Sequence, residues 1–498
     1  MLETLLKEKF GYSSFRQGQK EIIDSIIHRR HVFAVLPTGS GKSICYLLPG
    51  YVMEGLVIIV TPLLSLMEDQ CEQLRAHGEK RVKALNSFLS YQEKDRILGQ
   101  LRDLKYLFVS PEMLQNKKLL NQLAKIKLAL FVVDEAHCIS EWGHEFRTDY
   151  LKLANIRHTL GTAPCLALTA TANDHVKRDI IKQLDMEECD QYIYPIDRKN
   201  ISIAVKKCET INEKIEEAIS IIKMVHLPGI LYCGSRAWTE QLTSIIQVRT
   251  HYRVAYYHGG MTSEDRILIQ RQFIDGELDL IVCTNAFGMG INKSNVRLVM
   301  HFHYPKHINA YVQEIGRAGR DGKQSLAVLL YCPIDDEIPK HLIDQSYPDD
   351  DVLARIFSRI KYENAKLHSD ELLKIMQEEG ASETAAHFLQ YQLVQFPNMD
   401  LDMEKVHNKI KSTIHERKQH KWRELNEMKR WIETKRCRRE AYLELYNEQV
   451  IEKREPCCDH CGLNWDIFRK GKRETRSLEK MDTWEERLQK LLNNHLKV

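Results

Sequence analysis

The sequence predicts an α/β protein in which two tandem parallel-sheet domains of the P-loop type precede a helical region and a small cysteine-rich module. Three observations predict this class. With 498 residues, the chain is long enough for roughly three domains. Short runs that are apolar throughout end in polar, turn-like motifs, which is typical of strands buried on both faces. This pattern occurs twice, and after Pro333 it gives way to helical periodicity.

The composition is that of a folded protein, since 43% of the residues are hydrophobic and 28% are charged. Uncharged apolar runs of about eighteen residues do not occur, so no membrane partner is expected. The first nine residues alternate charge with apolar side chains, unlike a signal peptide. We therefore expect a cytoplasmic protein, associated with the nucleoid if it is bacterial. A basic excess in residues 401–498 fits either a polyanionic partner or a solvated surface.

The first predicted domain covers residues 1–200. Its strand candidates are His31–Pro37, Leu56–Thr61, Tyr106–Ser110, Leu128–Asp134 and Cys165–Thr169. In open parallel sheets, ligands bind outside the carboxyl ends of the strands. Because the polar motifs follow these strands, the pattern places a binding site at that edge of the sheet.

The second predicted domain covers residues 201–345 and repeats the pattern, with a linker expected at Cys189–Asn200. Its strand candidates are Gly229–Gly234, Arg253–Tyr257, Leu278–Cys283, Val296–Met300 and Leu326–Tyr331. No glycine fingerprint of a dinucleotide-binding fold accompanies these strands. Two sheets of P-loop type are therefore favoured over a dehydrogenase.

The remaining chain divides into three predicted parts: a helical region at 346–436, a cysteine-rich module at 437–465, and a basic tail at 466–498 with an amphipathic helix around Ser477–Leu492. Two helices separated by Gly380 fit either a helix-turn-helix or a plain helical hairpin. We also expect a long charged helical stretch over residues 403–446.

A phosphate-binding loop is predicted between the first strand and the following helix. Such a loop turns backbone N–H groups toward a triphosphate, with Lys42 reaching the β- and γ-phosphates of ATP and Ser43 binding Mg²⁺. Leu36 stands where the strict pattern has its first glycine, so a chance Gly-Ser-rich turn is the alternative. The candidate nucleotide-binding residues here are Pro37, Thr38, Gly39, Ser40, Gly41, Lys42 and Ser43.

A second motif, Asp134-Glu135-Ala136-His137, closes the fourth strand candidate. Asp134 is placed to hold Mg²⁺ through water, and Glu135 to orient and deprotonate the attacking water. A capped strand end with two solvated carboxylates is the alternative, which the phosphate loop upstream disfavours.

A third motif lies in the second domain, where Gln313 precedes Arg317 and Arg320. The two arginines are three residues apart, which would put them on one face of a helix. If the two sheets pack together, one guanidinium can reach the phosphates as an arginine finger from within the chain. Ordinary surface arginines are the alternative.

Together these motifs resemble superfamily 2 helicases, and more narrowly the RecQ family of DNA helicases. Further matches are Phe10–Gln19, Thr61–Gln70, Ser110–Glu112, Thr169–Thr171 and Thr284–Lys293. The resemblance implies two RecA-like domains and an ATP-dependent helicase that moves 3′→5′ on DNA during repair, recombination or replication. It also implies that Tyr12 stacks on the adenine of ATP, that Gln19 reads its edge, and that Arg16 supports both.

The segment after the acidic motif is similar to the aromatic-rich loop by which RecQ enzymes couple DNA binding to ATP hydrolysis. Its candidate residues are Trp142, His144, Phe146 and Arg147. Stacking of an unpaired base on an aromatic face contributes about 1–3 kcal/mol. A pair of core aromatic residues is the alternative.

Four of the 13 cysteines, Cys437, Cys457, Cys458 and Cys461, gather near the end of the chain. The other nine are scattered singly, and buried free thiols are expected there. The cluster resembles the RecQ zinc module, in which four thiolates hold Zn²⁺. Cys457 and Cys458 are adjacent, unlike the family's spaced triplet, so His460 in place of one thiolate is the rival ligand.

The resemblance is to a short form of the family without winged-helix and C-terminal accessory domains, since 37 residues follow Cys461. The expected partners are single-stranded and duplex DNA.

Two other functions stay open: an ATPase that depends on RNA, because Asp-Glu-Ala-His also occurs in RNA helicases, and a non-catalytic nucleic-acid-binding scaffold. The scaffold predicts that residues of the ATP motifs have been lost, but the candidate residues named above for ATP binding and hydrolysis are all present.

Overall fold

The computed structural model describes residues 1–62, 64–141, 148–287, 293–363, 370–394, 396, 403–450 and 456–470. Two predictions lie outside these residues: the aromatic-rich loop at Trp142–Arg147 and the tail helix around Ser477–Leu492. Among the helices that are described, none is both long and apolar enough to cross a membrane.

The first domain contains a seven-stranded sheet, ordered β3-β4-β2-β5-β6-β1-β7, in which every neighbouring pair is parallel. The strands are β1 His31–Val35, β2 Leu56–Val60, β3 Val82–Leu85, β4 Tyr106–Val109, β5 Leu128–Val133, β6 Cys165–Thr169 and β7 Cys189–Ile193. All five predicted strands are present. The predicted linker is wrong in its first half, because Cys189–Ile193 pairs with β1 as an edge strand.

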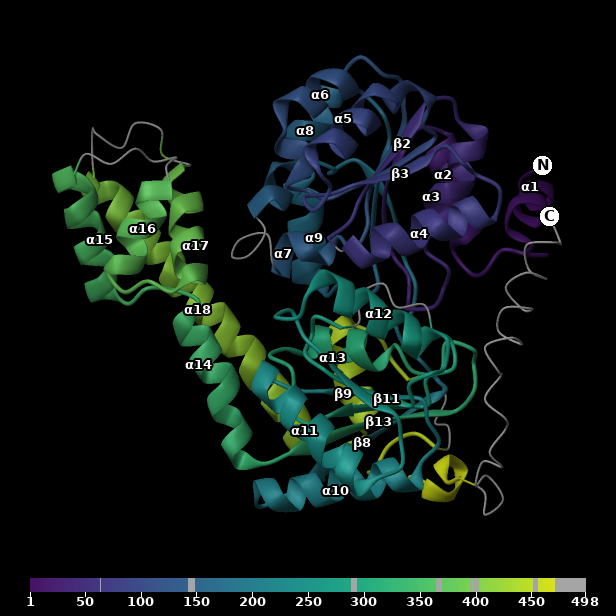
Figure 1. The fold of residues 1–498 in the computed structure, drawn as a ribbon, viewed down its shortest axis with the longest axis vertical. Coiled ribbons are helices and arrows are strands. Elements are labelled where there is room, and N and C mark those ends of the chain that lie inside the picture. The colour runs from purple at the N-terminus through teal and green to yellow at the C-terminus, as the bar shows by residue number, and fades with distance from the viewer. Residues whose placement is uncertain are drawn as a thin grey trace.

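Helices cover both faces of this sheet (Figure 1). They are α1 Leu2–Phe10, α2 Gln19–Ile27, α3 Ile44–Val52, α4 Leu64–Ala76, α5 Tyr91–Gly99, α6 Lys117–Leu123, α7 His137–Glu141, α8 Leu153–Leu160 and α9 Asp174–Gln183. Tyr46 on α3 and Met67 on α4 belong to the core on one face. Leu119 on α6 and Ile156 on α8 belong to the core on the other.

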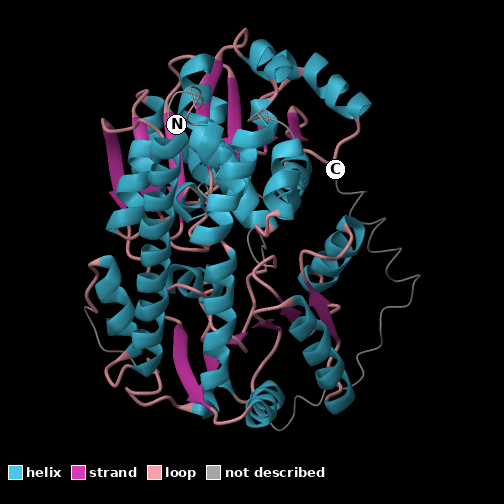
Figure 2. Ribbon diagram, turned by 90° about the vertical axis from the view of Figure 1, so that its left-hand side faces the viewer, coloured by secondary structure: helices cyan, strands magenta, loops and turns pink. Residues whose placement is uncertain are grey.

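The second domain contains a six-stranded parallel sheet ordered β10-β11-β9-β12-β13-β8. Its strands are β8 Ile201–Lys207, β9 Gly229–Tyr232, β10 Val254–Tyr257, β11 Leu280–Cys283, β12 Leu298–His301 and β13 Ser325–Tyr331. The helices are α10 Ile211–Met224, α11 Arg236–Arg249, α12 Ser263–Ile274 and α13 Ile308–Ile315. Figure 2 shows the strands in two separate groups, each surrounded by helices. Two tandem parallel-sheet domains are thus confirmed.

The helical region projects from the second domain as an arm (Figure 1). It consists of α14 Glu337–Gln345, α15 Asp350–Glu363, α16 Asp370–Glu378, α17 Glu383–Val394 and α18 Met403–Glu433, and the short helix α19 Arg438–Leu443 follows. The helices α15, α16, α17 and the first half of α18 share one hydrophobic core. The turn between α16 and α17 contains Gly380 at φ 100°.

Two predictions about this region need comment. The helical stretch expected over residues 403–446 is present but interrupted, because α18 ends at Glu433 and a turn separates it from α19. The pair α16–α17 forms as expected, but nothing in its packing tests DNA binding, so the helix-turn-helix stays a prediction. Single 3₁₀ turns occur at Leu101–Asp103, Met113–Gln115, Thr148–Lys152, Pro333–Asp336, Glu444–Tyr446 and Trp465–Phe468.

Candidate functional site

The phosphate-binding loop lies between β1 and α3, as expected. Gly39 and Gly41 adopt φ values of 84° and 78°, which favour glycine. A Cβ atom on Gly41 would lie 2.8 Å from the side-chain nitrogen of Gln19. A Cβ atom on Gly39 would lie 3.3 Å from the side chain of Arg320 in the other domain. The two glycines therefore let the loop bend between close neighbours from both domains.

The residues expected to read adenine converge on this loop. The Nε2 atom of Gln19 donates hydrogen bonds to the carbonyl oxygens of Ser40 at 2.9 Å and Gly41 at 3.0 Å. Its Oε1 atom accepts one from the backbone N–H of Arg16 at 2.9 Å. The guanidinium of Arg16 donates to the carbonyl oxygen of Gly39. Tyr12 is 52% exposed, so its ring is accessible for stacking.

The acidic pair follows the carboxyl end of β5. Lys42 Nζ lies 3.4 Å from Glu135 Oε1, and the backbone N–H of Glu135 donates to Asp134 Oδ1 at 2.9 Å. Burial, and then the charge of Glu135, raises the pKa of Asp134. Burial alone would also raise the pKa of Glu135, but its interactions with Lys42, His137 and Arg317 hold it below its usual value. Glu135 is thereby kept as a carboxylate, the form that accepts a proton.

The two side chains expected to bind Mg²⁺, those of Ser43 and Asp134, both lie near Tyr46. Burial raises the pKa of the Tyr46 hydroxyl, the nearby charge of Asp134 raises it further, and the nearby side chain of Ser43 lowers it. A hydroxyl and a carboxylate are hard oxygen ligands of the kind that Mg²⁺ prefers. The two side chains that the sequence proposed for this ion therefore lie close together and fit it.

A series of polar contacts links the acidic pair to the second domain. His137 Nδ1 lies 3.4 Å from Glu135 Oε2 and 3.1 Å from Thr169 Oγ1. The hydroxyl of Thr169 donates to the carbonyl oxygen of Thr171 at 2.9 Å. The amide of Gln313 on α13 donates to Thr171 Oγ1 at 2.8 Å. Thr169–Thr171 is recognisable in the sequence as a motif, but neither its role nor that of His137 can be predicted from the sequence.

Arg317 and Arg320 do not lie on a helix as predicted, because α13 ends at Ile315 and the chain turns at Gly316 and Gly319. Both side chains nevertheless lie near groups of the first domain. Arg317 contributes to the low pKa of the Glu135 carboxylate, and a Cβ atom on Gly39 would lie 3.3 Å from the side chain of Arg320. Burial, with the neighbouring charges of Arg317 and Arg198, lowers the pKa of Arg320 to about 10.

The positive charge and the unpaired polar groups at the phosphate-binding loop fit a bound polyanion. Lys42, Arg317 and Arg320 converge from both domains, and burying like charges together is costly without an anion. Among the described residues, Ser40 Oγ and Arg317 Nε are buried without a hydrogen-bond partner. The triphosphate of ATP supplies the missing negative charge and acceptor oxygens.

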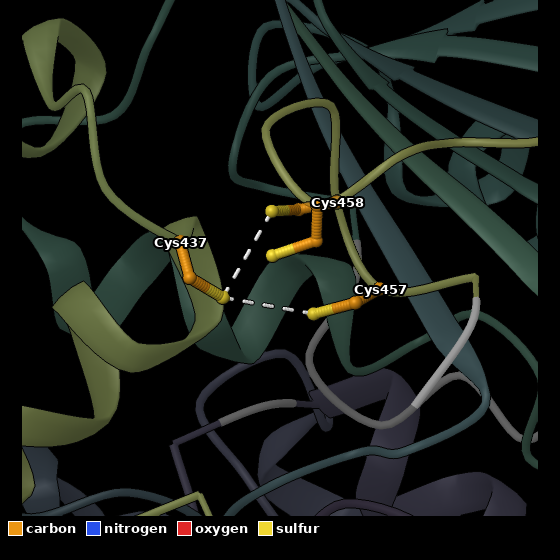
Figure 3. Close-up of side chains that lie close together, drawn as sticks. Cys437, Cys457 and Cys458 are labelled. Atoms are coloured by element: carbon orange, nitrogen blue, oxygen red, sulfur yellow. Dashed lines mark hydrogen bonds between the residues drawn. The ribbon is translucent and has the colours of Figure 1, made fainter. Parts of the chain in front are cut away.

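The four cysteines of the C-terminal cluster come together, and three of them, Cys437, Cys457 and Cys458, are drawn in Figure 3. Their Sγ atoms all lie within 4.8 Å of one another, with Cys437 Sγ at 3.7 Å from Cys457 Sγ and 3.9 Å from Cys458 Sγ. Thiolates about 2.3 Å from a tetrahedral zinc ion lie about 3.8 Å apart. His460 is exposed and does not belong to the cluster. The arrangement fits Zn²⁺ held by four thiolates and favours this set over the one with His460.

This cysteine module is attached to the edge of the second sheet. The backbone N–H of Ile203 in β8 donates to the carbonyl oxygen of Cys457 at 3.1 Å, and that of Asp459 donates to Ile203 at 3.0 Å. The buried guanidinium of Arg438 donates to Asp459 Oδ1 at 2.6 Å. The module therefore extends the sheet of the second domain. The other nine cysteines are free, and all except the half-buried Cys189 are buried.

Three family models match the chain. A DEAD/DEAH box helicase model matches residues 16–179, a helicase conserved C-terminal domain matches residues 213–322, and a RecQ zinc-binding model matches residues 401–462. The last match covers the four-cysteine cluster and assigns it to zinc.

The chain is similar to curated helicases over most of its length. It is 39% identical to the probable ATP-dependent DNA helicase RecS of Bacillus subtilis, with 99% of this chain and 98% of that protein covered. It is 38% identical to the ATP-dependent DNA helicase RecQ of Haemophilus influenzae, where 67% of this chain covers 53% of the relative. The chain thus matches about half the length of that relative.

Solved structures support the fold. The chain resembles the helicase MrfA bound to DNA with a TM-score of 0.57 at 19% identity, over 68% of this chain and 52% of that one. This likeness concerns the fold alone. Matches to both helicase domains, to the zinc region and to relatives at this identity agree with the geometry of the site, and the chain belongs to the RecQ family of DNA helicases.

Proposed function

We propose that the protein couples ATP hydrolysis at the interface of its two sheet domains to 3′→5′ movement along one DNA strand and to separation of the duplex. One observation carries the proposal: Lys42 and Glu135 in the first domain lie opposite Arg317 of the second. A site that is completed only when two domains meet converts hydrolysis into domain movement.

Nucleotide binding falls mainly to the first domain. Lys42 and the backbone of the phosphate loop bind the β- and γ-phosphates, while Tyr12 and Gln19 bind the adenine. Ser43 and Asp134 would hold Mg²⁺, which when bound neutralises charge on the phosphate oxygens. Gln19 is well placed for this role, since its hydrogen bonds to Ser40 and Gly41 join the adenine side to the phosphate side.

Hydrolysis needs groups from both domains. Glu135 takes a proton from the attacking water, because its low pKa keeps it ionised. Arg317 and Arg320 stabilise the negative charge that develops on the phosphate oxygens. Release of phosphate removes the anion that offsets these positive charges, and the domains then separate.

DNA is proposed to reach this site through the aromatic-rich loop, where Trp142 and Phe146 stack on unpaired bases and His144 and Arg147 support them. The loop follows α7 directly in the chain, and α7 begins at His137. His137 lies beside Glu135. A conformational change in the loop can therefore reach the hydrolytic carboxylate through the few residues of α7.

A strand-separation assay tests this function. A short duplex with a 3′ single-stranded tail, one with a 5′ tail, and a 3′-tailed RNA duplex are incubated with protein and ATP. We expect separation of the 3′-tailed DNA alone, and none with a non-hydrolysable analogue. Separation of the RNA duplex alone favours the RNA-dependent alternative, and DNA binding without ATP hydrolysis favours the scaffold. Cytoplasmic localisation, at the nucleoid in a bacterium, belongs to the same proposal.

A further inference from the structure

Arg198 lies on the segment between β7 and β8, where the chain passes from the first sheet to the second. Its Nη1 atom donates to the carbonyl oxygen of Thr38 at 2.8 Å and to its hydroxyl at 3.2 Å. Thr38 belongs to the phosphate loop of the first domain. Arg198 is therefore in direct contact with the proposed ATP site, although it lies in none of the motifs that predicted that site.

The same guanidinium also holds the second domain. Nη1 donates to the carbonyl oxygen of Gly316 at 2.9 Å, and Nη2 donates to those of Ala318 at 3.1 Å and Gly319 at 2.8 Å. These three residues form the turn that carries Arg317 and Arg320. The two loops joined by Arg198 touch each other as well, since Thr38 Oγ1 donates to the Gly316 carbonyl at 2.9 Å.

The acceptors around Arg198 suit a guanidinium and no other side chain. Five oxygen acceptors from two domains surround two nitrogen atoms of one planar group. Arginine presents five donors in a fixed fork, whereas lysine offers a point charge at the end of a flexible chain. A lysine in this position can reach acceptors in one domain but cannot span both with the same geometry.

Arg198 is itself held by the cysteine module. The buried guanidinium of Arg439 on α19 donates to the carbonyl oxygen of Arg198 at 3.2 Å and also to the carboxylate of Asp197. The hydroxyl of Tyr442 donates to Asp197 Oδ1 at 3.1 Å. Arg439 follows the zinc ligand Cys437 by two residues. The module therefore fixes the backbone from which Arg198 extends.

We propose that Arg198 is a positioning residue for ATP hydrolysis, which holds the phosphate loop against the turn that carries Arg317 and Arg320, and that Arg439 fixes its place. This inference rests on the proposed function. Arg198 acts through main-chain oxygens and Thr38 rather than on the nucleotide. Its loss should slow hydrolysis, which needs both domains, more than it weakens nucleotide binding, which needs mainly the first.

The test compares Arg198→Ala and Arg198→Lys with wild type and with Arg253→Ala. Arg253 is a matched control, because it pairs with Asp279 on the second domain, outside the contacts described above. For each variant, kcat and KM for ATP are measured with saturating single-stranded DNA, and the affinity for a fluorescent non-hydrolysable analogue is measured separately. Activities are normalised to the folded, zinc-containing fraction.

We expect Arg198→Ala to lower kcat about tenfold or more, while the affinity for the analogue changes less than about threefold. Arg198→Lys should recover only part of kcat, and Arg253→Ala should behave as wild type. Arg439→Ala should also lower kcat, and the double variant Arg198→Ala with Arg439→Ala should lose less than the product of the two separate losses, because both residues act through one contact.

A kcat like that of wild type in Arg198→Ala overturns the inference, and so does a loss that disappears after normalisation to folded protein. If Arg198→Ala does not fold, Arg198→Lys serves as the test. Full activity of Arg198→Lys would show that the forked guanidinium is not required and would overturn the inference. Wild-type protein without DNA-stimulated hydrolysis overturns the proposed function instead. Active wild type with an unaffected Arg198→Ala overturns only the inference.

Discussion

The side-chain amide of Gln313 in the second domain donates a 2.8 Å hydrogen bond to the hydroxyl of Thr171 in the first. Thr171 is linked through Thr169 to His137, which lies 3.4 Å from Glu135. A contact between domains is thus connected to the carboxylate proposed to deprotonate water, and we expect the relative position of the domains to affect that carboxylate.

Gln313→Ala should therefore lower kcat for ATP hydrolysis by about tenfold, the effect of about 1.4 kcal/mol in the transition state, with little change in nucleotide affinity. Steady-state kinetics with and without DNA measure this. Thr171→Val, which removes the accepting hydroxyl, should have a similar effect. If the double variant loses the full product of both single effects, the two side chains act independently and the relay is wrong.

Lys42→Ala and Glu135→Gln should each lower turnover by orders of magnitude, because both residues serve one transition state. They should differ in binding. Lys42→Ala removes a phosphate contact and weakens ATP affinity, whereas Glu135→Gln removes the base but leaves the phosphate loop intact. Near-normal ATPase activity in Glu135→Gln contradicts the water-activating role.

The aromatic-rich loop lies outside the described residues, so its role rests on sequence. Trp142→Ala or Phe146→Ala should leave basal ATP hydrolysis largely unchanged and reduce its stimulation by single-stranded DNA, since each stacked base contributes about 1–3 kcal/mol. DNA titrations of the ATPase rate measure this. Stimulation curves like those of wild type in both variants reduce the loop to a structural element.

Purified protein should contain about one zinc ion per chain, and Cys461→Ser should lose it. Apparent binding free energies of structural zinc sites are on the order of 10–16 kcal/mol, enough to decide whether a small module folds. Metal analysis and limited proteolysis should show a protease-sensitive C-terminal region while the ATP-binding domains stay folded. His460→Ala is the matched control and should keep the metal. Metal-free protein with a protected C-terminal region contradicts the zinc site.

Local patterns were enough to predict the phosphate loop and the acidic motif. Lys42 follows β1, which is buried except at His31, and Glu135 follows the fully buried β5, so their placement depends on the sequence just around them. The central strands were equally clear, because they are apolar throughout. Three strands escape the prediction: β3 and β7 lie at the two edges of the first sheet and β8 lies at one edge of the second, and polar side chains interrupt the apolar pattern in each.

Contacts between distant parts of the chain could not be predicted in this way. Arg198 and Thr38 are 160 residues apart, and no periodicity or motif links them. The end of α13 before Arg317 also depends on tertiary contacts, since a Cβ on Gly316 would lie 2.3 Å from the hydroxyl of Thr38. The sequence therefore predicts only a linker at Cys189–Asn200, although in the structure this segment contributes the side chain of Arg198 to the site.

ATP hydrolysis measured with single-stranded DNA, with single-stranded RNA and without polymer tests the central claim most directly, namely that one ATP site shared by two domains is driven by DNA. We expect DNA to raise the rate at least about tenfold, RNA to raise it little, and Lys42→Ala to abolish it under all three conditions. A rate that DNA leaves unchanged, or that RNA raises more than DNA does, contradicts the account.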